Sequence, residues 1–225
     1  IMATNPFAEY KWLALLKDWR VFAEGLSVTL EVAIVALLIS LALGILFGIA
    51  GVFPNKNVRK LNRIYVEFFQ NTPLVIQVIF LYHALPHLKI MLPVFLIGCL
   101  GIGLYTGAYM SEAVRSGILA IPRGQSEAGL SQGFTYFQTM RYIILPQAKR
   151  IILPNIANQS VSLIKNTSVL AMIAGGDLMY RADSWSGMNM YYGPTYLVTG
   201  VLYWLMCFPL TKYIKHLEKT AGVKS

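Results

Sequence analysis

Residues 26–53 read LSVTLEVAIVALLISLALGILFGIAGVF, and this stretch decides the fold class. Glu31 is its only charged residue. A helix needs about 20 mostly apolar residues to cross the ~30 Å hydrocarbon core of a bilayer. The stretch exceeds this minimum, so the sequence predicts a membrane-spanning helix here.

Four more stretches have a comparable length and apolar content. Only 13% of the 225 residues are charged, whereas soluble domains carry about a quarter, so too little charge is present to cover a water-facing surface. We therefore predict an all-α, polytopic membrane helical bundle that forms a single domain over residues 1–225. The five expected spans are residues 26–53, 61–85, 90–110, 151–174 and 194–213.

The distribution of Lys and Arg predicts the orientation in the membrane. Most of these residues lie after the first span, between the third and fourth spans, and after the fifth span. Cytoplasmic loops carry the excess of Lys and Arg, so we expect the N-terminus outside and the C-terminus in the cytoplasm. Residues 10–24 interleave apolar and charged side chains and contain Trp12 and Trp19. They predict an amphipathic helix on the outer surface; the alternative is the start of the first span.

The formal net charge of +9 would also suit a nucleic-acid-binding protein. The sequence has neither zinc-ligand spacing nor an aromatic–basic RNA motif, so we expect no nucleic-acid partner. Cys99 and Cys207 lie inside apolar stretches, and His83 and His87 have no third ligand near them in the sequence. We therefore expect no metal site and no cofactor bound by this chain.

The long segment between the third and fourth spans contains signals for short helices. Residues 122–126 (PRGQS) indicate a turn, in which Ser126 is expected to cap a helix that begins at Glu127. Gly133 is expected to end that helix, and residues 135–138 have the spacing of a capping box for the next one. Such a short helix is unstable alone, so it either packs on this protein's own bundle or docks on a soluble partner.

A gapped pattern in the same segment is specific. Glu127-Ala128-Gly129 is followed after three residues by Gly133, and after nine more by Ile143-x-Leu145-Pro146. This resembles the EAA loop of ABC importer permeases, whose pattern is EAA-x3-G-x9-I-x-LP, with Gly129 in place of an alanine. The resemblance implies that the coupling loop is residues 122–146 and that the ATPase-coupling residues are Glu127, Ala128, Gly129, Leu130, Gly133, Ile143, Leu145 and Pro146.

Neighbouring sequences narrow the resemblance to the polar amino acid permeases, the histidine, glutamine and arginine uptake group. It covers about residues 20–220 and includes EAVRSGI at 112–118, NTPL at 71–74 and LIKNTS at 163–168. Family members often carry Arg-Gly or Arg-Asn before the Thr-Pro pair. Gln70-Asn71 stands there in this chain, which removes the basis for expecting an anionic substrate.

The resemblance implies a type I ABC importer (MetI-like) permease fold in the bacterial cytoplasmic membrane, in contact with membrane lipid. It also implies a second permease subunit (in a homodimer or heterodimer), two cytoplasmic ABC ATPase subunits and an extracytoplasmic amino acid-binding protein. The sequence contains no G-x-x-x-x-G-K-[ST], so we expect the partner ATPase to use the ATP and Mg. The chain itself is expected not to be an enzyme, since no arrangement of nucleophile, base or paired carboxylates is evident.

Polar groups interrupt two of the expected spans. A charge at bilayer depth costs ~3 kcal/mol on insertion scales, so it usually faces a cavity or a partner, and broken helices line the substrate sites of transporters. The alternative for the break at residues 71–73 is a kink for packing. The alternative for Lys165 is an ion pair with Glu31 or Glu67, and that for Glu67 is a local pair with Arg63. Glu112 and Arg115 either form an inner gate or pair at the inner rim. The residues predicted to line the translocation path are Glu67, Asn71, Thr72, Pro73, Lys165, Asn166, Thr167 and Ser168.

The alternative function is a secondary transporter driven by an ion gradient. Such transporters are commonly built from two structural repeats. Five spans do not divide into equal halves, and no internal repeat is evident. The sequence therefore favours the ABC importer permease.

Overall fold

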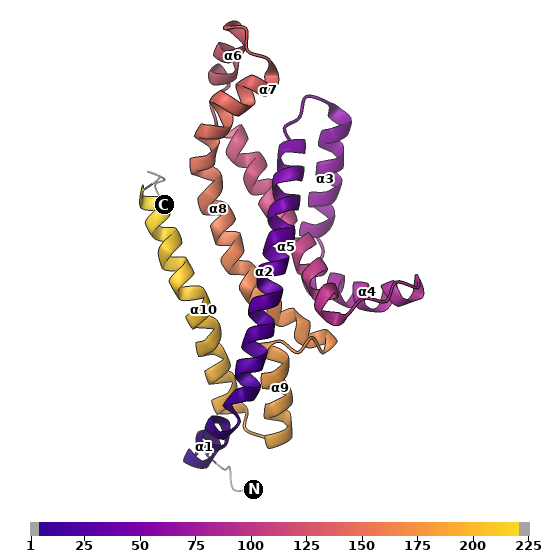
Figure 1. Ribbon diagram of the computed structural model, residues 1–225, viewed down its shortest axis with the longest axis vertical. Helices are drawn as coiled ribbons and strands as arrows, with labels where there is room; N and C mark the ends of the chain where they lie inside the picture. Colours follow the sequence, from indigo (N-terminus) through magenta and orange to yellow (C-terminus); the bar gives the residue numbers. More distant parts are fainter. Residues whose placement is uncertain (1–4, 221–225) are drawn as a thin grey trace. The chain divides into compact units, whose positions relative to one another are not determined.

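The structure of the chain, a computed structural model, describes residues 5–220, with side chains placed as far as residue 216. The described residues form helices and no strand (Figure 1), which confirms the all-α prediction. The helices are α1 (Glu9–Lys17), α2 (Trp19–Ala50), α3 (Lys56–Gln70), α4 (Leu74–His87), α5 (Val94–Leu119), α6 (Arg123–Ser131), α7 (Tyr136–Thr139), α8 (Leu145–Asn166), α9 (Leu178–Asn189) and α10 (Tyr192–Thr220). A π-helix, η1 (Met140–Ile144), joins α7 to α8, and a 3-10 helix, η2 (Thr167–Ile173), follows α8.

Three helices of the described chain, α2, α5 and α10, are long and apolar enough to cross a membrane. A fourth span results if α3 and α4 together form one broken span. The expected span at 151–174 corresponds to part of α8 and η2, which are absent from these candidates among the described residues. Asn155, Gln159 and Lys165 lower the apolar content of α8. By length and composition, the described chain therefore has three or four candidate spans, where the sequence predicts five.

The outer helix predicted at 10–24 is shorter than expected. α1 ends at Lys17, and α2 begins at Trp19, so residues 19–24 belong to the first turns of α2. At the junction, the backbone N–H of Asp18 donates to the carbonyl of Ala14. Lys219 and Lys224, which follow the fifth expected span and count toward the predicted orientation, lie outside the described side chains.

The chain divides into two compact units. The first consists of Ile1–Leu37, Pro73–Gly103 and Ser162–Leu210, and the second of Leu38–Thr72, Leu104–Val161 and Thr211–Ser225. The expectation of a single domain stays a prediction.

The core of the first unit joins α1, the start of α2 and α9. Trp185 lies 5.6 Å from Phe22, centroid to centroid, in an edge-to-face contact, and its indole N–H donates to Asp18 Oδ2 at 2.9 Å. Aromatic pairs of this geometry stabilise a core beyond the area that they bury. The buried members are Leu15, Phe22, Leu178, Ala182 and Trp185.

The core of the second unit joins α5, η1 and α8. Gly48 of α2 lies close to α5: a Cβ there would lie 2.5 Å from the Cβ of Val114. Small residues at such positions let membrane helices approach closely. The buried members of this core are Val114, Ile118, Ile144, Ala148 and Ile152.

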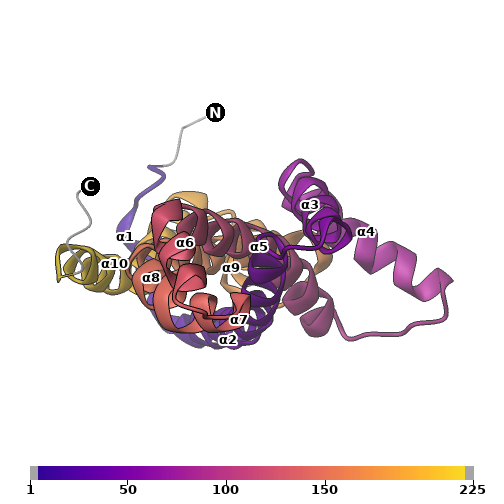
Figure 2. The same cartoon turned by 90° about the horizontal axis from the view of Figure 1, so that it is seen from above.

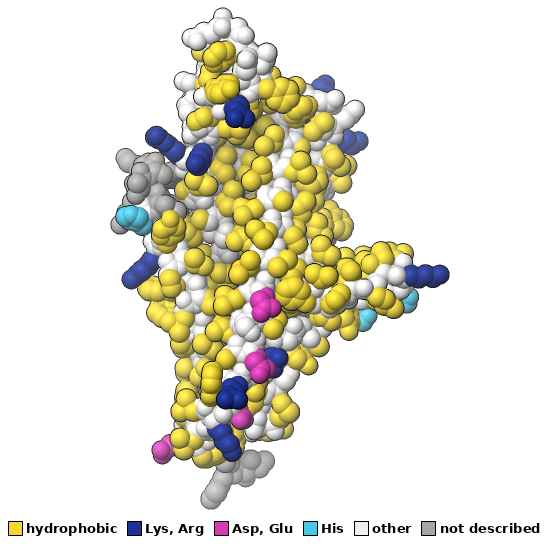
Figure 3. Space-filling model, in the orientation of Figure 1, with side chains coloured by type: hydrophobic (Ala, Val, Ile, Leu, Met, Phe, Trp, Pro, Cys, Tyr) yellow, Lys and Arg dark blue, Asp and Glu magenta, His cyan; other side chains and the backbone are white. Residues whose placement is uncertain are grey.

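Apolar side chains cover most of the face seen in Figure 3. Leu38, Leu46 and Phe80 are each more than 60% exposed. Large exposed apolar surfaces mark contacts with a membrane or a partner, which agrees with the membrane-spanning helices.

Candidate functional site

The segment predicted to couple to a partner begins one turn earlier than expected. α6 starts at Arg123, with Pro122 as its N-cap residue and no side-chain capping bond, so the predicted cap by Ser126 is wrong. Pro122 has φ −55° and ψ 135°, and the fixed φ of proline is compatible with a helix start at the next residue. Ser126 therefore lies inside the helix.

The predicted end of this helix and the start of the next one are confirmed. Gly133 has φ +83°, a conformation that glycine adopts without strain. The backbone N–H groups of Gly133 and Phe134 donate to the carbonyls of Leu130 and Gly129 at 3.0 and 3.1 Å. Thr135 and Gln138 then form the capping box, with each side chain accepting from the other's backbone N–H.

One side of α6 packs back on the helix that follows it, as both views show (Figures 1 and 2). Gly129 is buried, and Ile143 and Thr139 are its nearest neighbours beyond its own helix. The Tyr136 hydroxyl donates to the carbonyl of Val52 at 3.1 Å, and Ile144 belongs to the core of the second unit. Force applied to α6 can therefore reach α2, α5 and α8 through packed contacts.

The opposite side of this segment is exposed. Of the predicted coupling residues, Glu127, Ala128 and Leu130 lie on the surface. Phe137 is 68% exposed and Phe134 is 38% exposed. We call the surface of Glu127, Ala128, Leu130, Phe134 and Phe137 the exposed patch. Sequence reasoning missed its two aromatic residues, although large apolar side chains in a segment assigned to water were a signal.

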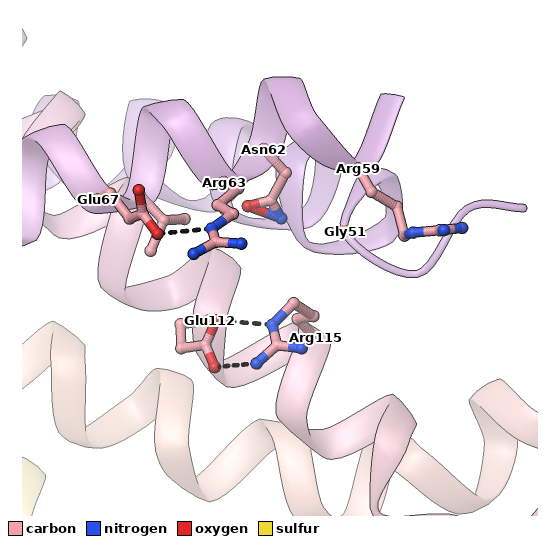
Figure 4. Close-up of a pocket in the computed structure, with 8 residues that line it drawn as sticks. Gly51, Arg59, Asn62, Arg63, Glu67, Glu112 and Arg115 are labelled. Carbon is pink, nitrogen blue, oxygen red and sulfur yellow. Dashed lines mark hydrogen bonds and ion pairs between the residues drawn. The ribbon is translucent and has the colours of Figure 1, made fainter. Parts of the chain in front are cut away.

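A second set of predicted residues lines a cavity of about 400 Å³ (Figure 4). Glu112 and Arg115 form a two-bond ion pair along α5, with N–O distances of 2.7 and 2.8 Å. Glu67 accepts from Arg63 Nε at 2.6 Å along α3, which confirms the local pair. This charged cavity is lined by Gly51, Arg59, Asn62, Arg63, Val66, Glu67, Glu112 and Arg115.

The predicted break after α3 is confirmed as a helix end. The Asn71 side-chain amide donates to the carbonyl of Glu67 at 2.7 Å, and the Thr72 hydroxyl donates to that of Phe68 at 2.8 Å. The Thr72 bond satisfies a carbonyl that the last helical turn leaves free, and the Glu67 carbonyl also accepts from the backbone N–H of Asn71. Pro73 is the N-cap residue of α4 and makes no side-chain capping bond. Asn71 and Thr72 therefore have a structural role at this end of α3.

Lys165 lies in a cleft of about 280 Å³ formed by α8, η2, α9 and α10. It makes no ion pair with a carboxylate among the described side chains of the first unit, so the alternative pair with Glu31 is not formed there. Thr167 is buried, and its hydroxyl donates to the carbonyl of Ile164; Asn166 is half-buried. The cleft is lined by Lys165, Ser168, Met179, Tyr196, Thr199, Gly200 and Tyr203.

Comparisons with known proteins agree with this arrangement. A family model described as "Binding-protein-dependent transport system inner membrane component" matches residues 19–222. The Bacillus subtilis (strain 168) protein named "Probable glutamine ABC transporter permease protein GlnM" is 36% identical over 205 residues, which are 91% of this chain and 95% of that protein.

Solved structures show the same fold. A structure described as "Crystal structure of an amino acid ABC transporter with histidines" matches with a TM-score of 0.86 and 28% sequence identity. The match covers 92% of this chain and 97% of the other chain. The inward-facing MetNI methionine ABC transporter has a TM-score of 0.65 and 16% identity, covering 94% and 99%. The predicted MetI-like fold is therefore confirmed.

Proposed function

Because this chain belongs to the family of inner membrane components of binding-protein-dependent transport systems, we propose that it takes up a polar amino acid as the permease subunit of an ABC importer. Its relative in Bacillus subtilis is named as a glutamine transporter permease, and the chain shares its fold with an amino acid ABC transporter. Glutamine and related polar amino acids are the substrates to test first.

The single observation that carries the proposal is the two-sided segment from α6 to η1. Its inner side is fixed to the protein by Gly129, Tyr136 and Ile144. Its outer side leaves the exposed patch free to enter a groove on a partner, which is a recurring mode of helix recognition. We infer that the partner is a separate ATPase, which uses ATP and Mg, and that this chain carries out no catalysis itself.

The remaining partners follow from the same proposal. A second permease subunit completes the translocation path, a second ATPase subunit completes the motor, and an extracytoplasmic binding protein delivers the amino acid. The orientation that fits is an N-terminus outside and a coupling segment in the cytoplasm, as the distribution of Lys and Arg predicts. The membrane that fits is the bacterial cytoplasmic membrane.

The test is ATP hydrolysis by the reconstituted complex. The chain is co-expressed with its candidate ATPase and binding protein, placed in proteoliposomes, and supplied with a panel of amino acids. One amino acid should stimulate hydrolysis, and Glu127→Arg in the exposed patch should abolish the stimulation. Glu9→Arg makes the same change at an exposed position of α1 and should keep it. A chain that never binds an ATPase, yet accumulates solute alone on an ion gradient, would instead be a secondary transporter.

A further inference from the structure

A groove of about 500 Å³ runs along α3, and most of its lining is cationic. All of its residues come from this one helix of the second unit. Its single carboxylate, on Glu67, already accepts from Arg63. The other cations of the groove are therefore not neutralised by a carboxylate of its own lining. We call this the basic groove, and it is lined by Lys56, Arg59, Lys60, Arg63, Ile64 and Glu67.

Two lysines of the basic groove are available to a ligand. Lys56 and Lys60 lie one turn apart on α3, are exposed, and make no ion pair with a carboxylate among the described side chains of the second unit. Arg59 differs, because its Nη1 donates to the carbonyls of Phe53 and Pro54 at 2.7 and 2.8 Å. These bonds hold its positive charge at the start of α3, in the same groove as the two ammonium groups.

An apolar row continues from the basic groove along the same helix. Leu61, Ile64 and Phe68 are each more than half exposed. Positions three and four apart are neighbours on one side of a helix, so these side chains form a continuous row on α3. Ile64 also lines the basic groove, which joins the row to the lysines. In Figure 3, Lys and Arg side chains lie at the upper end of α3, with apolar side chains below them.

The place of α3 in the membrane indicates which ligand fits this surface. α3 and α4 together form one candidate broken span, which puts the apolar row at the depth of acyl chains and the basic groove at one end of the span. Clusters of Lys and Arg at the end of a span attract anionic lipids, and exposed apolar surfaces mark membrane contacts. A soluble anion would contact only the lysines, whereas a phospholipid contacts both the groove and the row.

The positive charge of the groove also selects the headgroup. A phosphate diester accepts charge-assisted hydrogen bonds from ammonium groups. In a zwitterionic lipid the phosphate has an ammonium group of its own nearby, so it gains less from two lysines. A lipid with a net negative charge, such as phosphatidylglycerol, supplies the charge that the basic groove lacks.

We propose that the basic groove binds the phosphate of an anionic phospholipid, whose acyl chain lies along the apolar row. Lys56 and Lys60 donate to the phosphate oxygens, and Leu61, Ile64 and Phe68 contact the chain. This assignment concerns a bound lipid and goes beyond the proposed uptake of an amino acid.

Photo-crosslinking tests the site in a bilayer. The purified chain, with any ATPase that co-purifies, is placed in phosphatidylcholine vesicles that contain a trace of phosphatidylglycerol with a diazirine on its acyl chain. Phosphatidylcholine with the same labelled chain is the reference probe. After illumination, the labelled peptides are mapped by mass spectrometry. The phosphatidylglycerol probe should label residues 61–68 about tenfold more than the reference probe.

Variants then assign the preference to the lysines. The double variant Lys56→Gln and Lys60→Gln should remove most of the preference for phosphatidylglycerol. The matched control, Lys17→Gln and Arg20→Gln, removes two exposed cations near the start of the chain and should keep it. If the lysine variant fails to fold, the comparison of the two lipid probes on the unchanged chain decides the question.

Three outcomes would overturn the proposal. Equal labelling by the two probes would make the apolar row an ordinary lipid contact. Absence of labelling by both would show that protein, such as a second copy of this chain, covers the row. Loss of the preference in excess inorganic phosphate, but not in sodium chloride of the same ionic strength, would make the basic groove a site for a soluble anion.

Discussion

Gly129 packs directly against Ile143: a Cβ placed at Gly129 would lie 2.8 Å from Cδ1 of Ile143. Both residues belong to the gapped EAA pattern, and this contact folds α6 back onto η1. The spacing of the pattern therefore corresponds to a packing contact. Gly129 occupies the third position of the motif, and the side chain of Ile143, which the pattern places after the turn, limits the size of the residue there.

This contact predicts the effect of larger residues at position 129. Gly129→Ala gains up to about 1 kcal/mol of helix propensity and requires the end of the Ile143 side chain and the nearby Thr139 side chain to move slightly, so we expect a near-neutral change in thermal stability. Gly129→Leu overpacks the contact and should cost about 1–3 kcal/mol, with loss of amino-acid-stimulated ATP hydrolysis. Equal thermal midpoints and equal hydrolysis for the two variants would contradict the packing.

The turn after α6 predicts a backbone effect. Gly133 has φ +83° with open space around it, so a side chain there is opposed by strain and not by a clash. Gly133→Ala should destabilise the segment by about 1–2 kcal/mol. Gly133→Asn should cost less, because asparagine tolerates this region better. Protease sensitivity of the 131–136 linkage reports the change, and an alanine variant as resistant as the parent would argue against strain.

The hydrogen bond between Trp185 and Asp18 predicts a stability effect in the first unit. Asp18→Ala leaves the buried indole N–H without an acceptor, which costs about 1–3 kcal/mol. Asp18→Asn keeps an acceptor oxygen and is the matched control. Thermal unfolding in detergent, followed by tryptophan fluorescence, measures both. If the alanine and asparagine variants unfold together, the bond contributes nothing.

Asp177 predicts a pH dependence of stability. Burial raises the pKa of its carboxyl to about 6, although backbone hydrogen bonds from Met179 and Tyr180 oppose the shift. The folded state then binds the proton more tightly than the unfolded state does, so this contribution to stability is complete below the ordinary pKa of 3.8. It is lost as the pH rises through about 6.

Asp177→Asn should therefore flatten the fall of the unfolding midpoint between about pH 4 and pH 7, because asparagine can still cap α9 without a charge. The exposed-site control Glu9→Gln should keep the parental slope. A parental midpoint that rises across this range would reverse the sign and contradict the assignment.

Lys165 predicts a transport effect. If its ammonium group meets a substrate carboxylate in the cleft of the first unit, Lys165→Met should lower the apparent affinity for amino acid in the hydrolysis assay about tenfold, equivalent to about 1.4 kcal/mol. Lys165→Arg keeps the charge and should retain more activity. Assembly is checked by co-purification of the ATPase. Loss of assembly in Lys165→Met would instead indicate a structural role.

Local signals in the sequence predicted local structure correctly in several places. The capping box at 135–138 and the stop at Gly133 depend on residues a few positions apart, so their geometry could be predicted from spacing. The break at Asn71 was predicted for the same reason. Ser126 was wrongly expected to cap α6, because Pro122 had already started the helix one turn earlier.

Amino-acid sequence alone determined that this protein is an all-α membrane bundle with a two-helix coupling segment, because apolar length, turns and caps are properties of contiguous residues. Only the tertiary structure decided which side chains meet. Trp185 and Asp18 are 167 positions apart, and Arg63 faces Glu112 and Arg115 across the charged cavity from another helix. The packing of helices fixes their rotation and register, and those two quantities determine which polar side chains from distant segments share one site.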